Sequence, residues 1–137
     1  MNIRYAAAAD LPWLAAHDGH IAPGELQNLL ALRRVLLCED GDRRAGWLRW
    51  NLFWDNTPFL NMLYLLPEYR RRGSGRELVR FWEAEMTAQG YSRLLTSTQS
   101  NEDAQHFYRA LGYADAGVLL LPDEPAELLF LRELREG

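Results

Sequence analysis

The chain has 137 residues, 48% of them hydrophobic and 25% charged, and a formal net charge of −4. These values are typical of a soluble globular protein, and the length predicts one domain over residues 1–137. No apolar run approaches the ~20 residues of a membrane-spanning helix, and the N-terminus lacks the apolar core of a signal peptide. We therefore expect a cytoplasmic protein without membrane contact, and the acidic net charge disfavours a general nucleic-acid-binding surface.

Disulfide and metal chemistry have no support in the sequence. Cys38 is the only cysteine, so it cannot form an intramolecular disulfide, and its apolar neighbours favour a buried residue. The histidines His17, His20 and His106 form no ligand spacing with it. No metal cofactor is therefore expected.

The chain begins with short elements. Apolar patterning predicts a strand at residues 2–6, a helix that starts at Asp10, a loop at 17–23 and a helix that starts at Pro23. Asp10 is the predicted N-cap of the first helix, with Pro12 in its first turn.

A hairpin and a further strand follow. The strands at 34–39 and 44–54 flank an Asp-Gly step at 40–41, which is a strong hairpin signal. A turn at 55–58 leads to a strand at 59–66. The short connections predict that these three strands are antiparallel.

The rest of the chain alternates helices and strands. We predict a helix at 74–89 that Gly90 ends, a strand at 92–98, a helix from the N-cap Asn101 to Gly112, and strands at 114–121 and 127–134. Because a helix separates them, the strands at 59–66 and 92–98 must run parallel. The expected fold is α/β (α+β): a mixed, mostly antiparallel central sheet of about six to seven strands with one parallel pair, flanked by about four helices.

An arginine- and glycine-rich turn joins the strand at 59–66 to the helix at 74–89. It reads Tyr69-Arg70-Arg71-Arg72-Gly73-Ser74-Gly75-Arg76. A helix start presents N–H groups and a positive dipole to anions, glycines let the backbone approach a phosphate, and arginines add charged donors. A lone Gly-x-Gly is often only a turn. No Gly-Lys-Ser/Thr follows, and no third glycine completes a dinucleotide fingerprint.

The spacing Arg70-x-x-Gly73-x-Gly75 after a strand resembles the acetyl-coenzyme A loop of the GNAT superfamily of N-acetyltransferases, whose pattern is Gln/Arg-x-x-Gly-x-Gly/Ala. Residues 101–113 resemble a second family segment, Asn-x-x-Ala-x-x-x-Tyr-x-x-x-Gly-Phe/Tyr. The resemblance covers about residues 60–115 and implies acetyl-coenzyme A as the acyl donor, its pyrophosphate on the loop amides and its pantetheine arm along the preceding strand. The cofactor-binding residues that it implies are Leu63, Leu65, Leu66, Arg70, Arg71, Arg72, Gly73, Ser74, Gly75, Arg76, Asn101 and Tyr108.

The resemblance also implies a general acid. Tyr108 matches the family tyrosine that can donate its proton to the leaving thiolate, although a tyrosine on an apolar helix face is commonly a core residue. The attacking amine has a pKa of about 10 when free, so it must lose a proton. The strand at 59–66 has no carboxylate, and its polar residue Asn61 can orient the amine or a water but cannot act as a base. Asp55, Glu39 and the strand end at 97–99 are further candidates through water.

Aromatic residues suggest where the acceptor lies. Large aromatic rings occur at both odd and even positions of the strand at 44–54 and so point to both faces of the sheet. Some of them should therefore line a ligand-binding or interface surface. An aromatic wall with a carboxylate suits a cationic amine. The candidate residues are Trp47, Trp50, Phe53, Trp54, Asp55 and Phe59, with Ser97 at the neighbouring strand end. Core packing of Trp47 or Trp50 and a homodimer interface are the alternatives.

The favoured hypothesis is an N-acetyltransferase that acts on a small amine or a peptide amine. The missing strand carboxylate favours an alternative, an acyl-coenzyme A-binding regulatory or interaction module with the same fold and without turnover. A third interpretation, an RNA-binding surface at Arg70–Arg72, fits poorly with the acidic chain.

Overall fold

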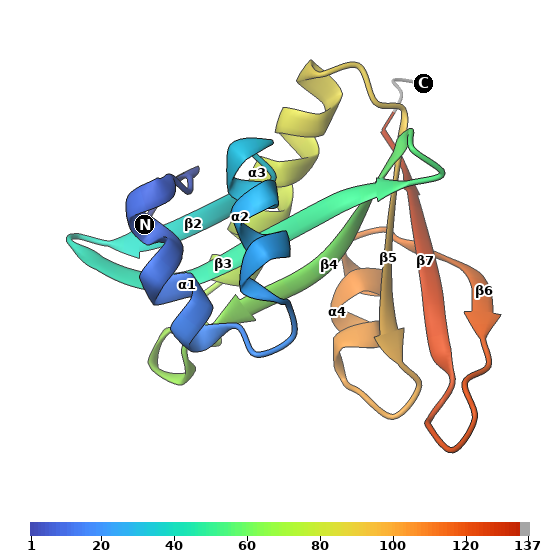
Figure 1. Ribbon diagram of the computed structural model, residues 1–137. Helices are drawn as coiled ribbons and strands as arrows, with labels where there is room; N and C mark the ends of the chain where they lie inside the picture. The colour runs from blue at the N-terminus through green and yellow to red at the C-terminus, as the bar shows by residue number, and fades with distance from the viewer. Residues whose placement is uncertain (135–137) are drawn as a thin grey trace. The chain divides into compact units, whose positions relative to one another are not determined.

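The computed structural model describes residues 1–134, and within them seven strands form one mixed sheet in the order β1-β2-β3-β4-β5-β7-β6 (Figure 1). The strands are β1 (Asn2–Tyr5), β2 (Val35–Asp40), β3 (Arg43–Phe53), β4 (Thr57–Leu65), β5 (Arg93–Gln99), β6 (Ala114–Leu119) and β7 (Glu127–Glu133). The helices are α1 (Leu11–His17), α2 (Pro23–Ala31), α3 (Ser74–Ala88) and α4 (Ala104–Ala110), with 3₁₀ turns η1 (Ala8–Asp10) and η2 (Pro67–Tyr69). The predicted fold class is confirmed, including the parallel pairing of β4 with β5.

The chain divides into two compact units, which are described separately. The first unit contains residues 1–51 and 62–82, and the second contains residues 52–61 and those from Glu83 onward. β3, β4 and α3 each contribute residues to both units. The predicted domain extent, 1–137, includes residues 135–137, which lie outside the described residues.

In the first unit, α1 and α2 pack on one face of the antiparallel strands β1, β2 and β3. All four residues of Val35–Cys38 are buried, because helices cover both faces of β2. Burying a leucine side chain contributes about 1.5–3 kcal/mol, so this cluster is a main source of stability. Its buried members are Ala6, Leu14, Leu26, Leu29, Leu30, Val35, Leu37 and Trp47.

The two tryptophans within β3 are core residues, so the prediction that they edge an acceptor pocket is wrong. Trp47 is 1% exposed, packs with the α1 and α2 cluster and donates its indole N–H to Asp18 at 3.1 Å. Trp50 is 2% exposed and its ring lies 6.2 Å from that of Trp82 on α3. β3 carries tryptophans at both odd and even positions because both of its faces pack against hydrophobic core.

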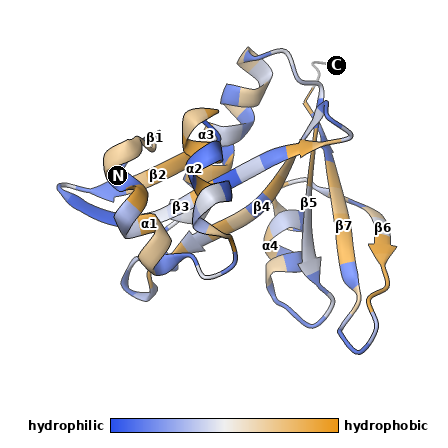
Figure 2. Cartoon of the chain, in the orientation of Figure 1, coloured by the Kyte–Doolittle hydropathy of each residue, from blue (hydrophilic) through white to orange (hydrophobic). Residues whose placement is uncertain are grey.

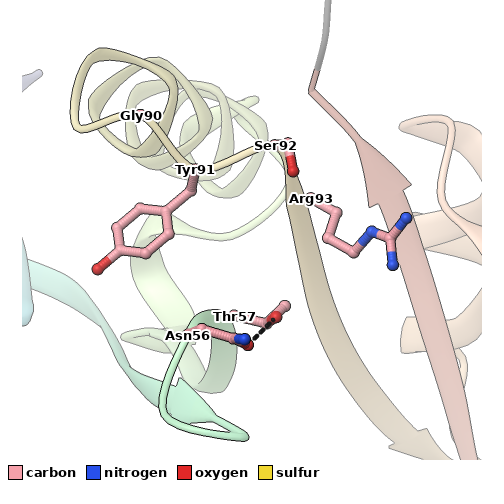
Figure 3. Close-up of a pocket in the computed structure, with 6 residues that line it drawn as sticks. All are labelled: Asn56, Thr57, Gly90, Tyr91, Ser92 and Arg93. Carbon is pink, nitrogen blue, oxygen red and sulfur yellow. Dashed lines mark hydrogen bonds between the residues drawn. The ribbon is translucent and has the colours of Figure 1, made fainter.

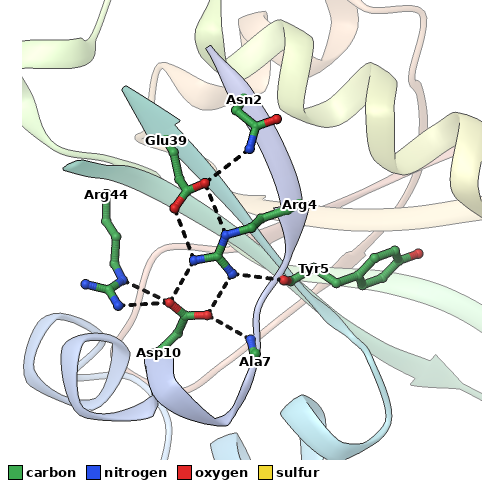
Figure 4. A network of polar contacts seen from close by, with 7 residues as sticks. All are labelled: Asn2, Arg4, Tyr5, Ala7, Asp10, Glu39 and Arg44. Carbon is green, nitrogen blue, oxygen red and sulfur yellow. Dashed lines mark hydrogen bonds and ion pairs between the residues drawn. The ribbon is translucent and has the colours of Figure 1, made fainter. Parts of the chain in front are cut away.

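Asp10 occupies the predicted N-cap position of α1, but its side chain makes no capping hydrogen bond to that helix. Its carboxylate accepts the N–H of Ala7 at 2.8 Å, and so caps η1 rather than α1 (Figure 4). Asp10 is 2% exposed and forms ion pairs with Arg4 at 2.8 Å and Arg44 at 3.0 Å. Glu39 accepts a further hydrogen bond from Arg4. This network ties β1, β2 and β3 to the start of α1.

Substituting Asn for Asp10 should lower the free energy of unfolding at pH 7 by about 2 kcal/mol, since two arginines lose a common buried partner and remain partly solvated. The hydrogen bond from Arg4 holds the pKa of Asp10 well below its usual range. The unfolded chain therefore binds a proton that the folded chain does not, and the contribution of Asp10, present above its unfolded pKa of about 4, is lost as the pH falls. Urea denaturation of Asp10→Asn at pH 7 and at pH 3.5 (roughly half a unit below the unfolded pKa) should show the difference from wild type shrinking at the lower pH. The exposed Asp42→Asn is the control, and an equal effect of both variants would contradict the assignment.

In the second unit, β5 lies between β4 and β7 and carries α4 on one face. β4 pairs with β5 through Phe59 and Leu60, and β7 pairs antiparallel with both β5 and β6. The α4 side of the sheet includes Thr96 and Phe130, which are almost fully buried. β6 forms an edge of the sheet and is strongly hydrophobic (Figure 2).

Gly90 and Gly112 end their helices as predicted, both with positive φ. Asn101 is not the N-cap of α4, which begins at Ala104. Residues 100–103 form a separate turn, because Glu102 accepts the N–H of Gln99 at 2.6 Å and the side chain of Gln105 donates to two carbonyls of the turn. Asn101 remains exposed.

Candidate functional site

The predicted cofactor loop lies wholly in the first unit, between the end of β4 and the start of α3. Tyr69 is 4% exposed and anchors η2, after which Arg71 and Gly73 adopt positive φ values of 62° and 80°. The N–H of Glu77 donates to the carbonyl of Gly73 and closes the first turn of α3. The N–H groups of Ser74, Gly75 and Arg76 precede that bond, so they have no partner within the helix.

A glycine occurs at position 73 because the residue directly before α3 must adopt the left-handed backbone conformation, with positive φ. Glycine adopts that conformation without strain. A Cβ atom at Gly73 would meet no atom within 4 Å, so the space beside this peptide is open. Arg72 and Arg76 are exposed next to it. Amides without intrahelical partners at the positive end of a helix, with arginines beside them, suit a diphosphate.

The four arginines are not equivalent. Arg70 donates through Nε to the carbonyl of Leu65 at 2.9 Å, and its guanidinium lies 5.1 Å from the ring of Tyr64. Arg72 lies 5.7 Å from the ring of Tyr69. Arg70 therefore fixes the exit of the chain from β4, and the arginines after it carry exposed charge.

The end of β4 is held tightly against β3. Leu66 donates its N–H to the carbonyl of Ala45 at 2.8 Å. A side chain at Gly46 would collide with the carbonyl of Tyr64 and with Leu65, so only glycine fits there. The N–H of Leu66 and the carbonyl of Leu65 thus already have partners within the protein, which sequence reasoning did not foresee when it assigned both residues to the cofactor.

The other predicted site residues belong to the second unit. They are Trp54, Asp55, Phe59, Asn61, Ser97, Asn101 and Tyr108. The structure brings Tyr108 close to β4 and β5, because its hydroxyl bonds with Thr96, whose own hydroxyl donates to the carbonyl of Leu60 at 3.0 Å.

Tyr108 is 4% exposed and packs among aromatic rings of α4, β7 and the segment after α4. Burial raises the pKa of Tyr108 to about 12. The phenol is therefore neutral over the whole physiological range and able to donate a proton. Thr96 uses its own proton for Leu60, so in this arrangement Tyr108 donates to the oxygen of Thr96.

The candidate bases differ in availability. Arg4 lowers the pKa of Glu39 through hydrogen bonding, so this carboxylate is a weaker base than an ordinary glutamate. Asp55 is exposed and has a positive φ of 64° in the turn between β3 and β4. Asn61 is exposed on β4. Sequence reasoning missed Glu127, whose carboxylate accepts the hydroxyl of Ser97 at 2.7 Å.

The aromatic residues of the turn between β3 and β4 form a small cluster. Trp54 is 75% exposed and lies 4.6 Å from the ring of Phe53, which in turn lies 5.9 Å from Phe59. These are the rings of the predicted acceptor wall that remain accessible.

A cavity of ≈ 280 Å³ lies at the amino ends of β4 and β5 (Figure 3). It is lined by Asn56, Thr57, Gly90, Tyr91, Ser92 and Arg93. None of the predicted site residues is among them, and Arg93 pairs with Glu133 at 3.3 Å.

Within residues 1–134, no helix is both long and apolar enough to span a membrane. Within the same residues, no three His, Cys, Asp or Glu side chains are grouped so that they could hold a metal ion.

A family model for acetyltransferases of the GNAT family matches residues 4–113. The chain belongs to the GNAT acetyltransferase family. The loop at 70–76 and the segment at 101–113 both lie within the match. Membership of this family supports the conclusion that the protein is an enzyme that transfers acetyl groups from acetyl-coenzyme A.

Solved GNAT structures share the fold along nearly the whole chain. A GNAT acetyltransferase from Bacillus cereus is 21% identical with a TM-score of 0.78, covering 96% of each chain. The ribosomal-protein-S18-alanine N-acetyltransferase of Escherichia coli is 18% identical with a TM-score of 0.81, covering 99% of this chain and 95% of that one. An aminoglycoside 6′-N-acetyltransferase in complex with coenzyme A is 16% identical with a TM-score of 0.78, covering 100% and 99%. A search of curated proteins found no match.

Proposed function

We propose that this GNAT protein is an N-acetyltransferase that moves the acetyl group of acetyl-coenzyme A to an amine of a small molecule or peptide. The observation that carries the proposal is the turn at residues 70–76. Its helix-start amides without intrahelical partners, its open glycine and its exposed arginine charges suit a diphosphate, and the family match covers it. Neighbours in the family that act on amines support the choice of acceptor.

Acetyl-coenzyme A supplies an activated acetyl group: the amine nitrogen bonds to the acetyl carbon, the carbon–sulfur bond breaks, and coenzyme A leaves as its thiol. In the proposed roles, the amides of Ser74, Gly75 and Arg76 bind the diphosphate. Tyr108 gives its proton to the sulfur, and its burial keeps that proton in place until the reaction. Asn61 orients the amine or a water that removes its proton.

Release of free thiol from acetyl-coenzyme A tests this function. Across a panel of amines, amino acids and peptides, at least one acceptor should give acceptor-dependent thiol release with a KM between about 1 µM and 1 mM. Mass spectrometry of the product should show one added acetyl group on nitrogen. Transfer to a hydroxyl alone would contradict the proposal.

The lack of a carboxylate on β4 favours a second candidate, an acyl-coenzyme A-binding module. It would bind acetyl-coenzyme A in calorimetry and release no thiol with any acceptor. The same two measurements therefore separate the two functions.

A further inference from the structure

Glu127 is a half-buried carboxylate at the start of β7 that has no cationic partner within residues 1–134. The hydroxyl of Ser97 on β5 donates to its Oε2 atom at 2.7 Å. That hydrogen bond fixes the carboxylate and leaves lone pairs on both oxygens for another donor. Glu127 thus differs from Glu83 in the same unit, which pairs with Arg132 and accepts the hydroxyl of Tyr113.

A carboxylate that has lost part of its water gains from a cation, because desolvation weakens its hydration and strengthens its attraction to opposite charge. The protein satisfies Glu83 in this way with its own arginine. At Glu127 it supplies one neutral hydroxyl instead. Such an arrangement suits a carboxylate whose cation comes from a ligand.

The register of the strands shows what surrounds Glu127. Gln99 pairs with Glu127, and Phe59 pairs with Leu95, so each pair lies on one face of the sheet. Ser97 is two residues from both Leu95 and Gln99 and shares their face. Phe59, Ser97, Gln99 and Glu127 therefore line the same surface, opposite the α4 side where Thr96 contacts Tyr108.

Aromatic rings flank this surface at the β4 side. Phe59 contacts Phe53, and Phe53 contacts the exposed Trp54. Ring faces attract ammonium and guanidinium groups. A cationic ligand on this face would therefore meet a carboxylate at one end and aromatic rings at the other.

We propose that Glu127 pairs with a cationic group of the acceptor, one distinct from the nitrogen that is acetylated. This inference rests on the proposed function. β5 separates β7 from the part of β4 that pairs with it, Phe59 and Leu60, and neighbouring strands are about 4.8 Å apart, so β7 lies about 10 Å across the sheet from the predicted acceptor residue Phe59. The acceptor class is therefore an amine that carries a second ammonium or guanidinium group several bonds away.

Two matched amines test the assignment: 1,5-diaminopentane, with two ammonium groups, and 1-aminopentane, with one. Calorimetric titration of the full chain should show the diamine binding at least tenfold more tightly than the monoamine. Glu127→Gln keeps an acceptor for Ser97 and removes the charge. It should weaken the diamine about tenfold and leave the monoamine and acetyl-coenzyme A within about twofold of wild type.

Two further variants sharpen the result. Glu124→Gln makes the same charge change in the exposed turn between β6 and β7 and should alter neither amine. Ser97→Ala removes the hydroxyl that positions the carboxylate and should weaken the diamine about threefold. Thermal unfolding of each variant checks that the fold is intact.

Equal binding of the two amines by wild type, binding of neither, or an unchanged preference in Glu127→Gln would overturn the inference. If those results accompany acceptor-dependent thiol release, the transferase function stands without this site. If the diamine preference depends on Glu127 but no amine panel gives thiol release, the cation site stands and the transferase function fails.

Discussion

Acetyl-coenzyme A affinity should fall by more than about a hundredfold when Arg72→Glu and Gly73→Trp are combined. Gly73 has a φ of +80°, a conformation that tryptophan adopts only with strain, and its neighbouring space is open. A large ring there would cover the amides at the start of α3, and glutamate at position 72 would repel phosphate. Isothermal titration calorimetry with acetyl-coenzyme A measures the effect.

The matched control is Arg33→Glu combined with Gly24→Trp, which makes the same changes of charge and size at exposed positions around α2. Its affinity for acetyl-coenzyme A should stay within about threefold of wild type. Retained affinity in the loop variant, with an intact fold, would mean that the diphosphate does not bind at residues 70–76.

Turnover should fall about a hundredfold in Tyr108→Phe, while the affinity for acetyl-coenzyme A changes by less than about twofold. The substitution removes only the hydroxyl, so the buried ring still packs against Phe130. Because burial raises the pKa of Tyr108 to about 12, wild-type kcat should show no decline from deprotonation of this group below pH 10 (roughly two units lower). Thiol release at saturating substrates measures kcat.

Tyr113→Phe is the control for the loss of a buried hydroxyl. Tyr113 donates to Glu83 at 2.8 Å, so its substitution should cost about 1–3 kcal/mol of stability and leave kcat nearly unchanged. If both variants reduce turnover equally, or if Tyr108→Phe has wild-type kcat, Tyr108 is a core residue without a role as the acid.

The parts of the fold that were predictable are those set by local patterning. Gly90 and Gly112 end their helices because both need positive φ, and the parallel relation of β4 and β5 follows from the helix between them. The start of α4 was missed because side-chain bonds from Glu102 and Gln105 stabilise a separate turn in which Asn101 lies. Such bonds depend on a local geometry that spacing does not show.

The candidate site was predictable where it follows a motif and unpredictable where it depends on pairing across the sheet. The loop at 70–76 and Tyr108 are part of recognisable patterns. The pairing of Ser97 with Glu127 joins residues 30 positions apart, and no pattern in either strand indicates it. The burial of Trp47 and Trp50 likewise required knowledge that both faces of β3 are covered.

Arg70 is held by the chain itself, with its guanidinium bonded to the carbonyl of Leu65 and placed over Tyr64. Neither contact neutralises its charge, because the carbonyl and the ring are uncharged and Arg70 stays exposed. The loop therefore attracts a polyanion at long range with four cations, one of which is held in a fixed orientation. Raising the ionic strength should accordingly slow ligand capture, because Debye screening acts on exposed charge.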